Sequence, residues 1–381
     1  MAMSSVVQDL RSFVYEALPA RVIFGSGTLS QLGDELERAG ISRPLFLSTS
    51  NQRDFTTAVL GQLHPKASRF APALFAGAVM HTPTVVTERA LVVAREHRAD
   101  GIVAIGGGST IGLGKAIALR TDLPQLVVPT TYAGSEMTPI LGETANGVKT
   151  TQRNPRILPE IVIYDVDLTM TLPVGLSAAS GLNAIAHAVE ALYARDRNPI
   201  ISLVAEEAVR ALARALPLIA ESSLNRDARA EALYGAWLCG TCLGAVGMAL
   251  HHKLCHALAG KFDLPHAQTH AVLLPHALAY NASAAPDAAL AVARALGASD
   301  PARALYDLAG RLGVPQSLSA IGMPVGAVDA ATDEALRAPY WNPRSMERPA
   351  IRNLIAHALE GLAPPAPSPG QLAYSEVAGA P

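Results

Sequence analysis

The stretch Gly101-Ile-Val-Ala-Ile-Gly-Gly-Gly-Ser109 decides how the first half of the chain folds. An apolar run of strand length ends there in three glycines and a serine, and a helix-compatible segment follows. Bare backbone N–H groups at such a helix start can bind a diphosphate, and the Ser109 hydroxyl adds a donor. A plain tight turn would have the same sequence, and the spacing is neither a Walker A loop nor G-x-G-x-x-G. The glycine triplet alone therefore leaves both interpretations open.

A second polar loop follows the next apolar run, Gln125–Val128. Its sequence is Pro129-Thr-Thr-Tyr-Ala-Gly-Ser-Glu-Met-Thr138, with hydroxyls at Thr130, Thr131, Ser135 and Thr138. Open α/β sheets bind ligands at the carboxyl ends of their strands, so both loops would line one crevice. The alternative is an ordinary polar loop with a helix cap. Two such loops, at Gly106–Ser109 and here, together favour dinucleotide binding.

The surrounding pattern predicts a parallel sheet covered by helices. Short apolar runs alternate with helix-period segments such as Thr84–His97, which is typical of an α/β domain. The predicted strands are Arg21–Phe24, Pro44–Leu47, Gly101–Ile105, Gln125–Val128 and Ile161–Tyr164. We expect residues 1–165 to form a Rossmann-like dinucleotide-binding domain.

From Pro173 onward the strand pattern ends and helices are predicted throughout. The predicted helices are Leu176–Ala194, Ile200–Ala220, Ala228–Leu250, Leu254–Gly260, Pro286–Leu296 and Pro301–Leu312. We expect residues 166–362 to form an all-helical catalytic domain. Residues 363–381 are rich in proline and are expected to be a flexible tail.

Composition limits the class of protein. The 381 residues are 50% hydrophobic and 16% charged, which excludes global disorder. A net charge of −2 argues against coating a nucleic acid, and the N-terminus has no signal-peptide core, so a cytoplasmic location is expected. The uncharged segment Ala232–Leu250 approaches the length of a membrane span. Its glycines and the histidines that follow favour a buried helix, so no membrane association is expected.

Histidines concentrate in the second half, where six of the eleven lie between His251 and His276. Asn183 and His187 are four residues apart, as are His252 and His256, so each pair would share a helix face. Together with His266 they predict a polar pocket that could hold a metal or polarise a carbonyl. Each histidine alone could equally be an ordinary core or surface residue. The pair Cys239 and Cys242 lies in mid-helix, which argues against a thioredoxin-like motif.

These residues resemble the motifs of the group III (iron-containing) alcohol dehydrogenases, across nearly the whole chain. The matching motifs are Gly106-Gly-Gly-Ser109, Pro129-Thr-Thr with Gly134-Ser-Glu-Met-Thr138, Ser180-Gly-Leu-Asn-Ala-Ile-Ala-His187-Ala-Val-Glu190, and His252-x3-His256 with Pro265-His266. The resemblance implies a dehydroquinate synthase-like architecture and an active site between an α/β and an α domain. It also implies NAD(P) as cofactor and a homo-oligomer, most simply a dimer.

The resemblance implies a metal held by one Asp and three His, and here the chain departs from the family. The equivalent positions are Asn183, His187, His252 and His266, so a neutral amide replaces the carboxylate. Because a hard cation prefers carboxylate oxygen, we expect that a metal is not required, although the three histidines could still hold zinc.

Other departures concern the cofactor. Gly112 replaces the family's Asp after the glycine turn, and the Thr-Thr loop is one residue short and contains Tyr132. Thr49 stands where many members have an acid that rejects NADPH, so NADH is expected with NADPH possible. Lys149 completes the residues that the resemblance places at the cofactor.

Further motifs resemble one branch of the family, whose members reduce a conjugated C=C bond late in bacterial degradation of aromatic compounds. The motifs are Ala78-Val-Met-His-Thr-Pro83, Thr150-Thr-Gln-Arg-Asn-Pro-Arg156, His251-His-Lys-Leu-Cys-His256 and Tyr340-Trp-Asn-Pro-Arg344. The substrate of that branch is a small unsaturated keto-dicarboxylate. Lys253 and Arg344 are the expected carboxylate partners, with Arg156 weaker. The histidines at 187, 252, 256 and 266 would supply the enolate donor and the proton.

Two other functions remain open from the sequence. One is a metal-dependent dehydrogenase of small alcohols or aldehydes, which keeps the fold but needs a tightly bound metal. The other is a non-catalytic nucleotide-binding protein, against which the cost of burying many imidazoles argues.

Overall fold

The computed structural model describes residues 13–18, 20–62, 69–338 and 340–366. The chain forms two compact units, one of residues Ala17–Leu172 and one beginning at Pro173 that also takes in residues 13–16. The division falls seven residues after the predicted boundary at 165, because the 3-10 turn Val166–Thr169 and the residues after it group with the first unit. The predicted tail lies mostly outside the described residues.

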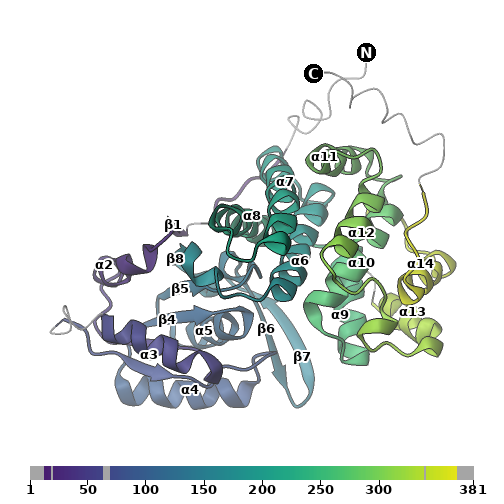
Figure 1. The fold of residues 1–381 in the computed structure, drawn as a ribbon. Coiled ribbons are helices and arrows are strands. Elements are labelled where there is room, and N and C mark those ends of the chain that lie inside the picture. Colours follow the sequence, from purple (N-terminus) through teal and green to yellow (C-terminus); the bar gives the residue numbers. More distant parts are fainter. Residues whose placement is uncertain (1–12, 19, 63–68, 339, 367–381) are drawn as a thin grey trace. The chain divides into compact units, whose positions relative to one another are not determined.

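The first unit is built on a six-stranded parallel sheet with the order β1-β8-β5-β4-β2-β3 (Figure 1). The five predicted strands are all present within a residue of their expected bounds. The strands are β1 (Arg21–Gly25), β2 (Pro44–Leu47), β3 (Ala73–Phe75), β4 (Gly101–Gly106), β5 (Gln125–Pro129) and β8 (Ile161–Asp165). The three central strands β4, β5 and β8 are buried along their whole length, as expected for a sheet covered on both faces.

Helices connect the strands, as the alternating pattern predicts. They are α2 (Leu32–Arg38), α3 (Arg53–Gln62), α4 (Thr84–His97) and α5 (Gly108–Thr121). The predicted helix Thr84–His97 is confirmed at both ends. An antiparallel hairpin of β6 (Ile140–Ala145) and β7 (Val148–Arg153) was not predicted, since all six residues of β7 are exposed and mostly polar.

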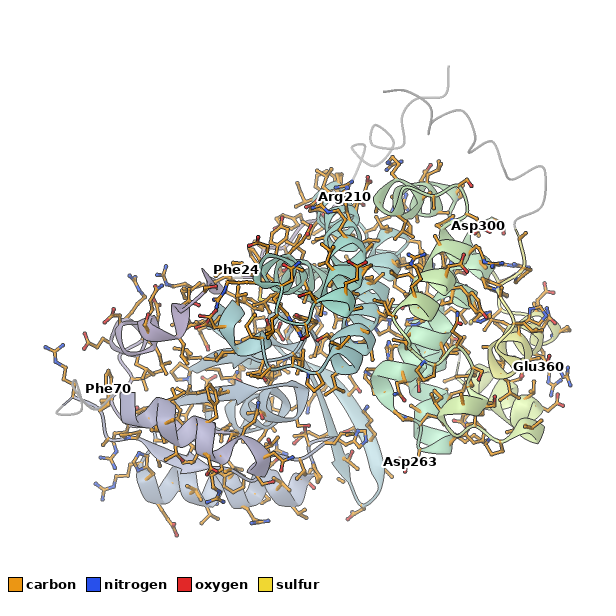
Figure 2. The ribbon with its side chains drawn as sticks, viewed as in Figure 1. Phe24, Phe70, Arg210, Asp263, Asp300 and Glu360 are labelled. Atoms are coloured by element: carbon orange, nitrogen blue, oxygen red, sulfur yellow. The ribbon has the colours of Figure 1, made fainter. Side chains whose placement is uncertain are left out.

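The second unit is helical, as predicted. Its helices are α6 (Val174–Leu192), α7 (Pro199–Glu221), α8 (Arg226–Ala245), α9 (Leu250–Phe262), α10 (His266–Asn281), α11 (Pro286–Leu296), α12 (Pro301–Arg311), α13 (Val328–Leu336) and α14 (Arg348–Glu360). The helices α10, α13 and α14 were not predicted from the sequence. Asp263 and Glu360, labelled in Figure 2, mark the ends of α9 and α14.

One predicted helix is wrong at its end. The segment expected to be helical to Leu250 stops at Ala245, and α9 starts after a short break with its axis 94° from that of α8. The cause is tertiary, because the Glu190 carboxylate accepts the backbone N–H groups of Ala249 and His251 at 3.0 and 2.9 Å and so starts a new helix there. Among the described residues no single helix is long and apolar enough to cross a membrane, although α8 and α9 would pass as a bent pair.

Candidate active site

In the first unit, the glycine turn between β4 and α5 is closed on one side and open on the other. A Cβ on Gly106 would lie 2.7 Å from the Gln52 side-chain oxygen, and one on Gly107 would lie 3.0 Å from Thr131. Gly108 has nothing within 4 Å of its Cβ position. Gly108 is also the first residue of α5, whose first N–H groups have no partner within the helix. This turn therefore fits a diphosphate.

The loops that follow β2, β4 and β5 meet at this turn. Thr130 donates its backbone N–H to the Gly106 carbonyl at 3.1 Å, and its hydroxyl accepts from Gln52 Nε2 at 3.2 Å. Thr49 precedes the short 3-10 helix Ser50–Gln52 after β2. The structure thus gathers the predicted cofactor residues Thr49, Gly106, Gly107, Gly108, Ser109, Thr130 and Thr131 at one edge of the sheet.

Two of the four predicted loop hydroxyls face inward. The ammonium of Lys115 on α5 lies 2.8 Å from Thr138 Oγ1 and 3.3 Å from Ser135 Oγ, and it also donates to the carbonyls of Ser135 and Ile140. Lys115 is completely buried and Thr138 is 1% exposed. These two hydroxyls therefore hold the loop in place, while Thr130 and Thr131 remain at the glycine turn.

Lys115 is a buried cation that sequence reasoning missed. Burial lowers the pKa of Lys115 to about 7, while nearby Glu136 raises it. Four oxygen acceptors surround the nitrogen at 2.5 to 3.3 Å, and a neutral amine would turn its lone pair toward one of them. The contacts therefore favour the ammonium. Glu136 is buried beside it and accepts the Tyr164 hydroxyl at 2.8 Å.

Gly112 has a steric explanation. A Cβ at this position would collide with the Thr82 hydroxyl, so the Asp that the family carries there does not fit beside Thr82. Thr82 and its neighbour His81 both have positive φ, at 45° and 66°, which is rare for a β-branched residue. Gly112 and the His81-Thr82 turn therefore pack closely together, and a side chain at position 112 would require Thr82 to move.

The remaining predicted residues of this unit lie on its surface. Lys149 is in β7, where it is exposed. Arg156 is exposed and lies 3.7 Å from Asp122, which makes it a surface ion pair rather than a substrate ligand.

In the second unit, the predicted pair of α6, Asn183 and His187, joins His252 of α9 in a hydrogen-bonded chain. Asn183 Nδ2 lies 3.4 Å from His187 Nε2, and His187 Nδ1 lies 2.8 Å from His252 Nε2. His252 Nδ1 in turn lies 2.6 Å from a carboxylate oxygen of Glu190. All four side chains are 5% exposed or less.

Glu190 anchors this chain, and the sequence did not single it out. Besides His252 Nδ1, its two oxygens accept the backbone N–H groups of Ala249, His251 and His252 at 2.9 to 3.3 Å. Burial raises the pKa of Glu190, and these N–H groups lower it. One carboxylate thus fixes both the start of α9 and the orientation of the His252 ring. Its position within the family motif was the available signal.

The tautomers of the chain follow from its two ends. Burial, then the charges of His266 and Lys253, lower the pKa of His252 to about 3, so its ring is neutral near pH 7. A neutral ring that donates Nδ1–H to Glu190 must accept at Nε2, so His187 donates from Nδ1. His187 Nε2 is then an acceptor, which the Asn183 amide can satisfy and an aspartate could not. The amide at position 183 therefore provides the donor that this hydrogen-bonded chain needs at its end.

Four further side chains complete the histidine cluster, which we define as His187, His251, His252, His256, His266 and His270. The rings of His266 and His270 have centroids 4.3 Å apart, and those of His256 and His266 stack at 6.0 Å. His256 is exposed and His266 half-buried, whereas His251 and His270 are fully buried. The four histidines predicted as catalytic are thus brought together, with His251 and His270 added by the fold.

The two predicted cations separate. Lys253 is exposed on α9, one residue from His252, with its ammonium 5.9 Å from the centre of the Tyr340 ring. Arg344 donates to the Tyr280 carbonyl at 3.0 Å and lies over the Tyr280 ring, and the cavity that it lines contains no member of the histidine cluster. Lys253 thus follows His252 in the chain, whereas Arg344 lines a cavity without a member of the cluster, and both stay proposed carboxylate partners.

The residues at the family's metal position differ from the family's ligand set. Position 183 has an amide in place of the carboxylate. His187 Nδ1 and His252 Nε2 form a hydrogen bond with each other at 2.8 Å. Among the described residues, two other sets bring donor atoms within 4.8 Å of one another, namely Glu190 with His251 and His252, and His251 with Cys255 and His270. Neither set includes His187 or His266, and the oxygens of Glu190 are engaged by N–H groups.

Fold and site together match one family. The model of the iron-containing alcohol dehydrogenases matches residues 19–166, and the model of the C-terminal part of the Fe-containing alcohol dehydrogenase family matches residues 177–359. The chain belongs to the iron-containing alcohol dehydrogenase family. It is an NAD(P)-dependent oxidoreductase, which sets aside the non-catalytic alternative.

Within that family the relatives point to one branch. A maleylacetate reductase of Rhizobium sp. is 56% identical over 93% of this chain and all of the relative, and one of Burkholderia cepacia is 52% identical over the same shares. The crystal structure of maleylacetate reductase from Agrobacterium tumefaciens superposes with a TM-score of 0.89, at 54% identity over 93% of this chain and all of that one. A 1,3-propanediol oxidoreductase has a TM-score of 0.85 at 28% identity, covering 92% and 100%. The sequence motifs predicted a resemblance to this branch, and these relatives confirm it.

Proposed function

We propose that this protein reduces maleylacetate to 3-oxoadipate with NADH, and with NADPH as a possible substitute, late in bacterial degradation of aromatic compounds. The observation that carries the proposal is the 56% identity to a maleylacetate reductase over that enzyme's whole length. The hydrogen-bonded chain of Asn183, His187 and His252 is consistent with this proposal. Its side chains are neutral hydrogen-bond donors and include no acidic metal ligand. We also propose that it acts as a cytoplasmic homodimer, as the family resemblance implies.

The substrate is a dianion in which a C=C bond is conjugated to a ketone. Bound nicotinamide would supply a hydride for the alkene carbon. The chain itself must then hold carboxylates, stabilise the enolate oxygen and provide a proton. Lys253 is exposed beside the histidine cluster and is the proposed carboxylate partner. A neutral amide at Asn183 adds no negative charge that would repel a dianion.

The histidine cluster supplies the other two functions. Buried His187 and His252 are oriented by Glu190 and Asn183, so their positions are fixed before substrate arrives. His256 and His266 are more accessible, so one of them is the proposed source of the proton at the substrate carbon. Because the metal position is occupied by hydrogen bonds among its own ligand residues, we propose that turnover needs no metal.

The cofactor half of the proposal rests on the first unit. The open side of Gly108 at the start of α5 is the proposed diphosphate site, with Ser109 and Thr131 beside it. Ser135 and Thr138 are proposed to shape the loop from inside rather than to touch the cofactor. Thr49 and Lys149 stay proposed cofactor residues, and the neutral Thr49 side chain is the reason that NADPH is not excluded.

The test is oxidation of NADH followed at 340 nm with freshly generated maleylacetate, before and after exhaustive EDTA treatment, together with the metal content of both samples. We expect turnover that survives chelation. The matched variant is Asn183→Asp, which restores a carboxylate of the same shape and should raise the metal content while lowering the rate. An unchanged metal content and rate in this variant would contradict the proposed reason for the amide.

The competing function is that of a metal-dependent dehydrogenase of small alcohols, which the 1,3-propanediol oxidoreductase neighbour represents. Turnover of simple aldehydes that disappears on chelation, with none of maleylacetate, would establish that function instead.

A further inference from the structure

The first turn of α9 is capped by side chains from outside the helix. Its N-cap residue is Ala249, whose methyl side chain cannot accept a hydrogen bond. The first four N–H groups of a helix have no partner within that helix. Glu190 accepts three of these groups, and the fourth, that of Leu250, donates to Oδ1 of Asn342 at 3.3 Å. Asn342 therefore completes a cap that Glu190 alone leaves open.

The hydrogen bond to Asn342 holds one particular peptide plane. The Leu250 N–H belongs to the same planar peptide unit as the Ala249 carbonyl. That carbonyl accepts the backbone N–H of Lys253 at 3.2 Å, which is the first hydrogen bond within the helix. The plane is thus bonded to Asn342 on one side and to Lys253 on the other. Asn342 therefore helps to fix the backbone at Lys253.

The Asn342 amide is fixed in one orientation. Its Oδ1 also accepts from Asn281 Nδ2 at 3.0 Å, and its Nδ2 donates to Asn281 Oδ1 at 2.8 Å and to the Arg344 carbonyl at 2.7 Å. Asn281 is fully buried at the end of α10. Exchanging the oxygen and nitrogen of Asn342 would set its nitrogen against the Leu250 N–H and its oxygen against the Arg344 carbonyl. The network thus directs the amide oxygen at α9.

The loop 340–345, which contains Asn342, also contacts the Lys253 side chain. The centre of the Tyr340 ring lies 5.9 Å from the Lys253 ammonium, within reach of a cation–π contact. Lys253 is exposed and follows His252, and its charge is among the causes that lower the pKa of the His252 ring. The loop therefore acts on both the backbone and the ammonium of Lys253.

A second attachment of this loop does not involve α9. The Tyr280 hydroxyl donates to the Ser345 carbonyl at 2.7 Å, and Arg344 donates to the Tyr280 carbonyl at 3.0 Å. Removing the Tyr280 hydroxyl would loosen the loop while leaving the contacts of Leu250 and Lys253 in place. The chain therefore offers a control for loss of loop stability alone.

We propose that Asn342 is a positioning residue that places the Lys253 ammonium for a substrate carboxylate, with Tyr340 as the second contact. This inference rests on the proposed function, in which Lys253 binds a carboxylate of maleylacetate. The His252 ring is held by Glu190 and not by Asn342, so the role of Asn342 concerns substrate binding rather than turnover. Asn342 thereby gains a role within the Tyr340–Arg344 motif.

The first experiment compares steady-state kinetics of full-length variants with maleylacetate and NADH. In Asn342→Ala we expect the KM for maleylacetate to rise about 10-fold, as for a weakened hydrogen bond to a charged group. The kcat should change by less than about 3-fold and the KM for NADH by less than about 2-fold, because a lost binding contact acts on KM.

Tyr280→Phe is the matched control, since it removes one hydrogen bond of the same loop. Its KM for maleylacetate should stay within about 2-fold of the wild-type value. An equal rise in Tyr280→Phe and Asn342→Ala would mean that the loop acts only through its general stability, and it would overturn the proposal.

The double variant tests whether Asn342 acts through Lys253. Lys253→Met alone should raise the KM for maleylacetate about 10-fold or more. With the ammonium gone, adding Asn342→Ala should change this KM by less than about 2-fold, because residues that act through one another are not additive. A further rise as large as in the wild-type background would show an independent structural role and would overturn the proposal.

The contact with Tyr340 has its own matched pair of variants. Tyr340→Leu removes the ring and should raise the KM for maleylacetate about 3-fold. Tyr340→Phe keeps the ring and removes a hydroxyl that has no hydrogen-bond partner among the described residues, so its KM should not change. Equal values in the two variants would contradict the role of the ring.

Hydrogen exchange without substrate separates this inference from the proposed function. The peptide that contains the Leu250 amide should exchange about 10-fold faster in Asn342→Ala, and not in Tyr280→Phe. Unchanged exchange, or an unchanged KM in an enzyme that reduces maleylacetate, would contradict this inference alone. Wild-type enzyme without any turnover of maleylacetate would instead contradict the proposed function, and with it the role of Lys253.

Discussion

Lys115 in the first unit and Glu190 in the helical unit are both fully buried charged side chains, and the two are used in opposite ways. In the first unit the Lys115 ammonium donates to oxygens of the loop 135–140. In the helical unit the Glu190 carboxylate accepts N–H groups at the start of α9 and from the His252 ring. Both charges have more hydrogen-bond partners than an ordinary surface residue. These hydrogen bonds offset the free-energy cost of removing a charge from water.

The difference lies in what each charge holds. The partners of Lys115 are mostly backbone carbonyls and short hydroxyls, so it fixes the path of a loop that we propose lies at the cofactor. Glu190 holds a ring of the histidine cluster, so it fixes the chemistry-bearing side chain itself. Disturbing Lys115 should therefore act on cofactor binding, whereas disturbing Glu190 should act on turnover.

The largest effect is expected from Glu190→Gln. The amide nitrogen would face an N–H donor, and the neutral group would no longer fix the Nδ1–H tautomer of His252. We expect kcat for maleylacetate to fall by about 100-fold to 1000-fold, as for loss of a positioned acid–base group. The KM for NADH should change by less than twofold in the same steady-state measurements.

Tyr193→Phe is the matched control for this variant. It removes one 3.3 Å hydroxyl contact to Glu190 and leaves the carboxylate and its N–H partners in place. A decrease in kcat as large as that of Glu190→Gln would show that general loosening, rather than the carboxylate, is responsible. A raised KM for NADH in Glu190→Gln would contradict the assignment of cofactor binding to the first unit and of turnover to the helical unit.

The next largest effect is expected from Lys115→Met, which keeps the length of the side chain and removes its charge. Breaking a buried pair leaves Glu136 without its cation, which typically costs 3–5 kcal/mol, so we expect about 3 kcal/mol less unfolding free energy. The loop 135–140 loses its anchor, so the KM for NADH should rise about 10-fold, with kcat changing by less than about 3-fold.

The double variant Lys115→Met with Glu136→Gln separates stability from positioning. Removing both charges should restore part of the unfolding free energy, because no unpaired charge remains buried. The KM for NADH should stay high, since the acceptors on Ser135 and Thr138 still lack a donor. Recovery of KM together with stability would mean that Lys115 has a purely structural role.

Sequence patterns predicted every strand of the parallel sheet except the short β3, and most of the helices, because periodicity reports which face of an element is buried. They missed β7, whose residues are polar and exposed, and they continued α8 to Leu250 because the composition stays apolar there. The true break depends on Glu190, a contact 59 residues away from Ala249 in the chain. Spacing likewise found the paired histidines, whereas Lys115 and Glu190 are charged helix residues that no local pattern marks as buried.

The smallest effect expected here concerns acid, and it tests whether the helical unit keeps its buried imidazoles neutral. Burial lowers the pKa of His276 to about 4 from the usual 6.5 of a histidine. Between these two values the unfolded chain takes up a proton that the folded chain excludes, so this contribution is complete above pH 6.5 and is lost as pH falls toward 4. At about 1.4 kcal/mol per pH unit, unfolding free energy should fall by about 2 kcal/mol between pH 6.5 and 5 on account of this group.

In His276→Leu, urea unfolding at these two pH values should show a drop smaller by that amount, whereas replacing the exposed His81 by Asn should leave the drop as it is. An equal drop in wild type and His276→Leu would show that the ring takes up its proton in the folded state as readily as in the unfolded chain, which contradicts the lowered pKa.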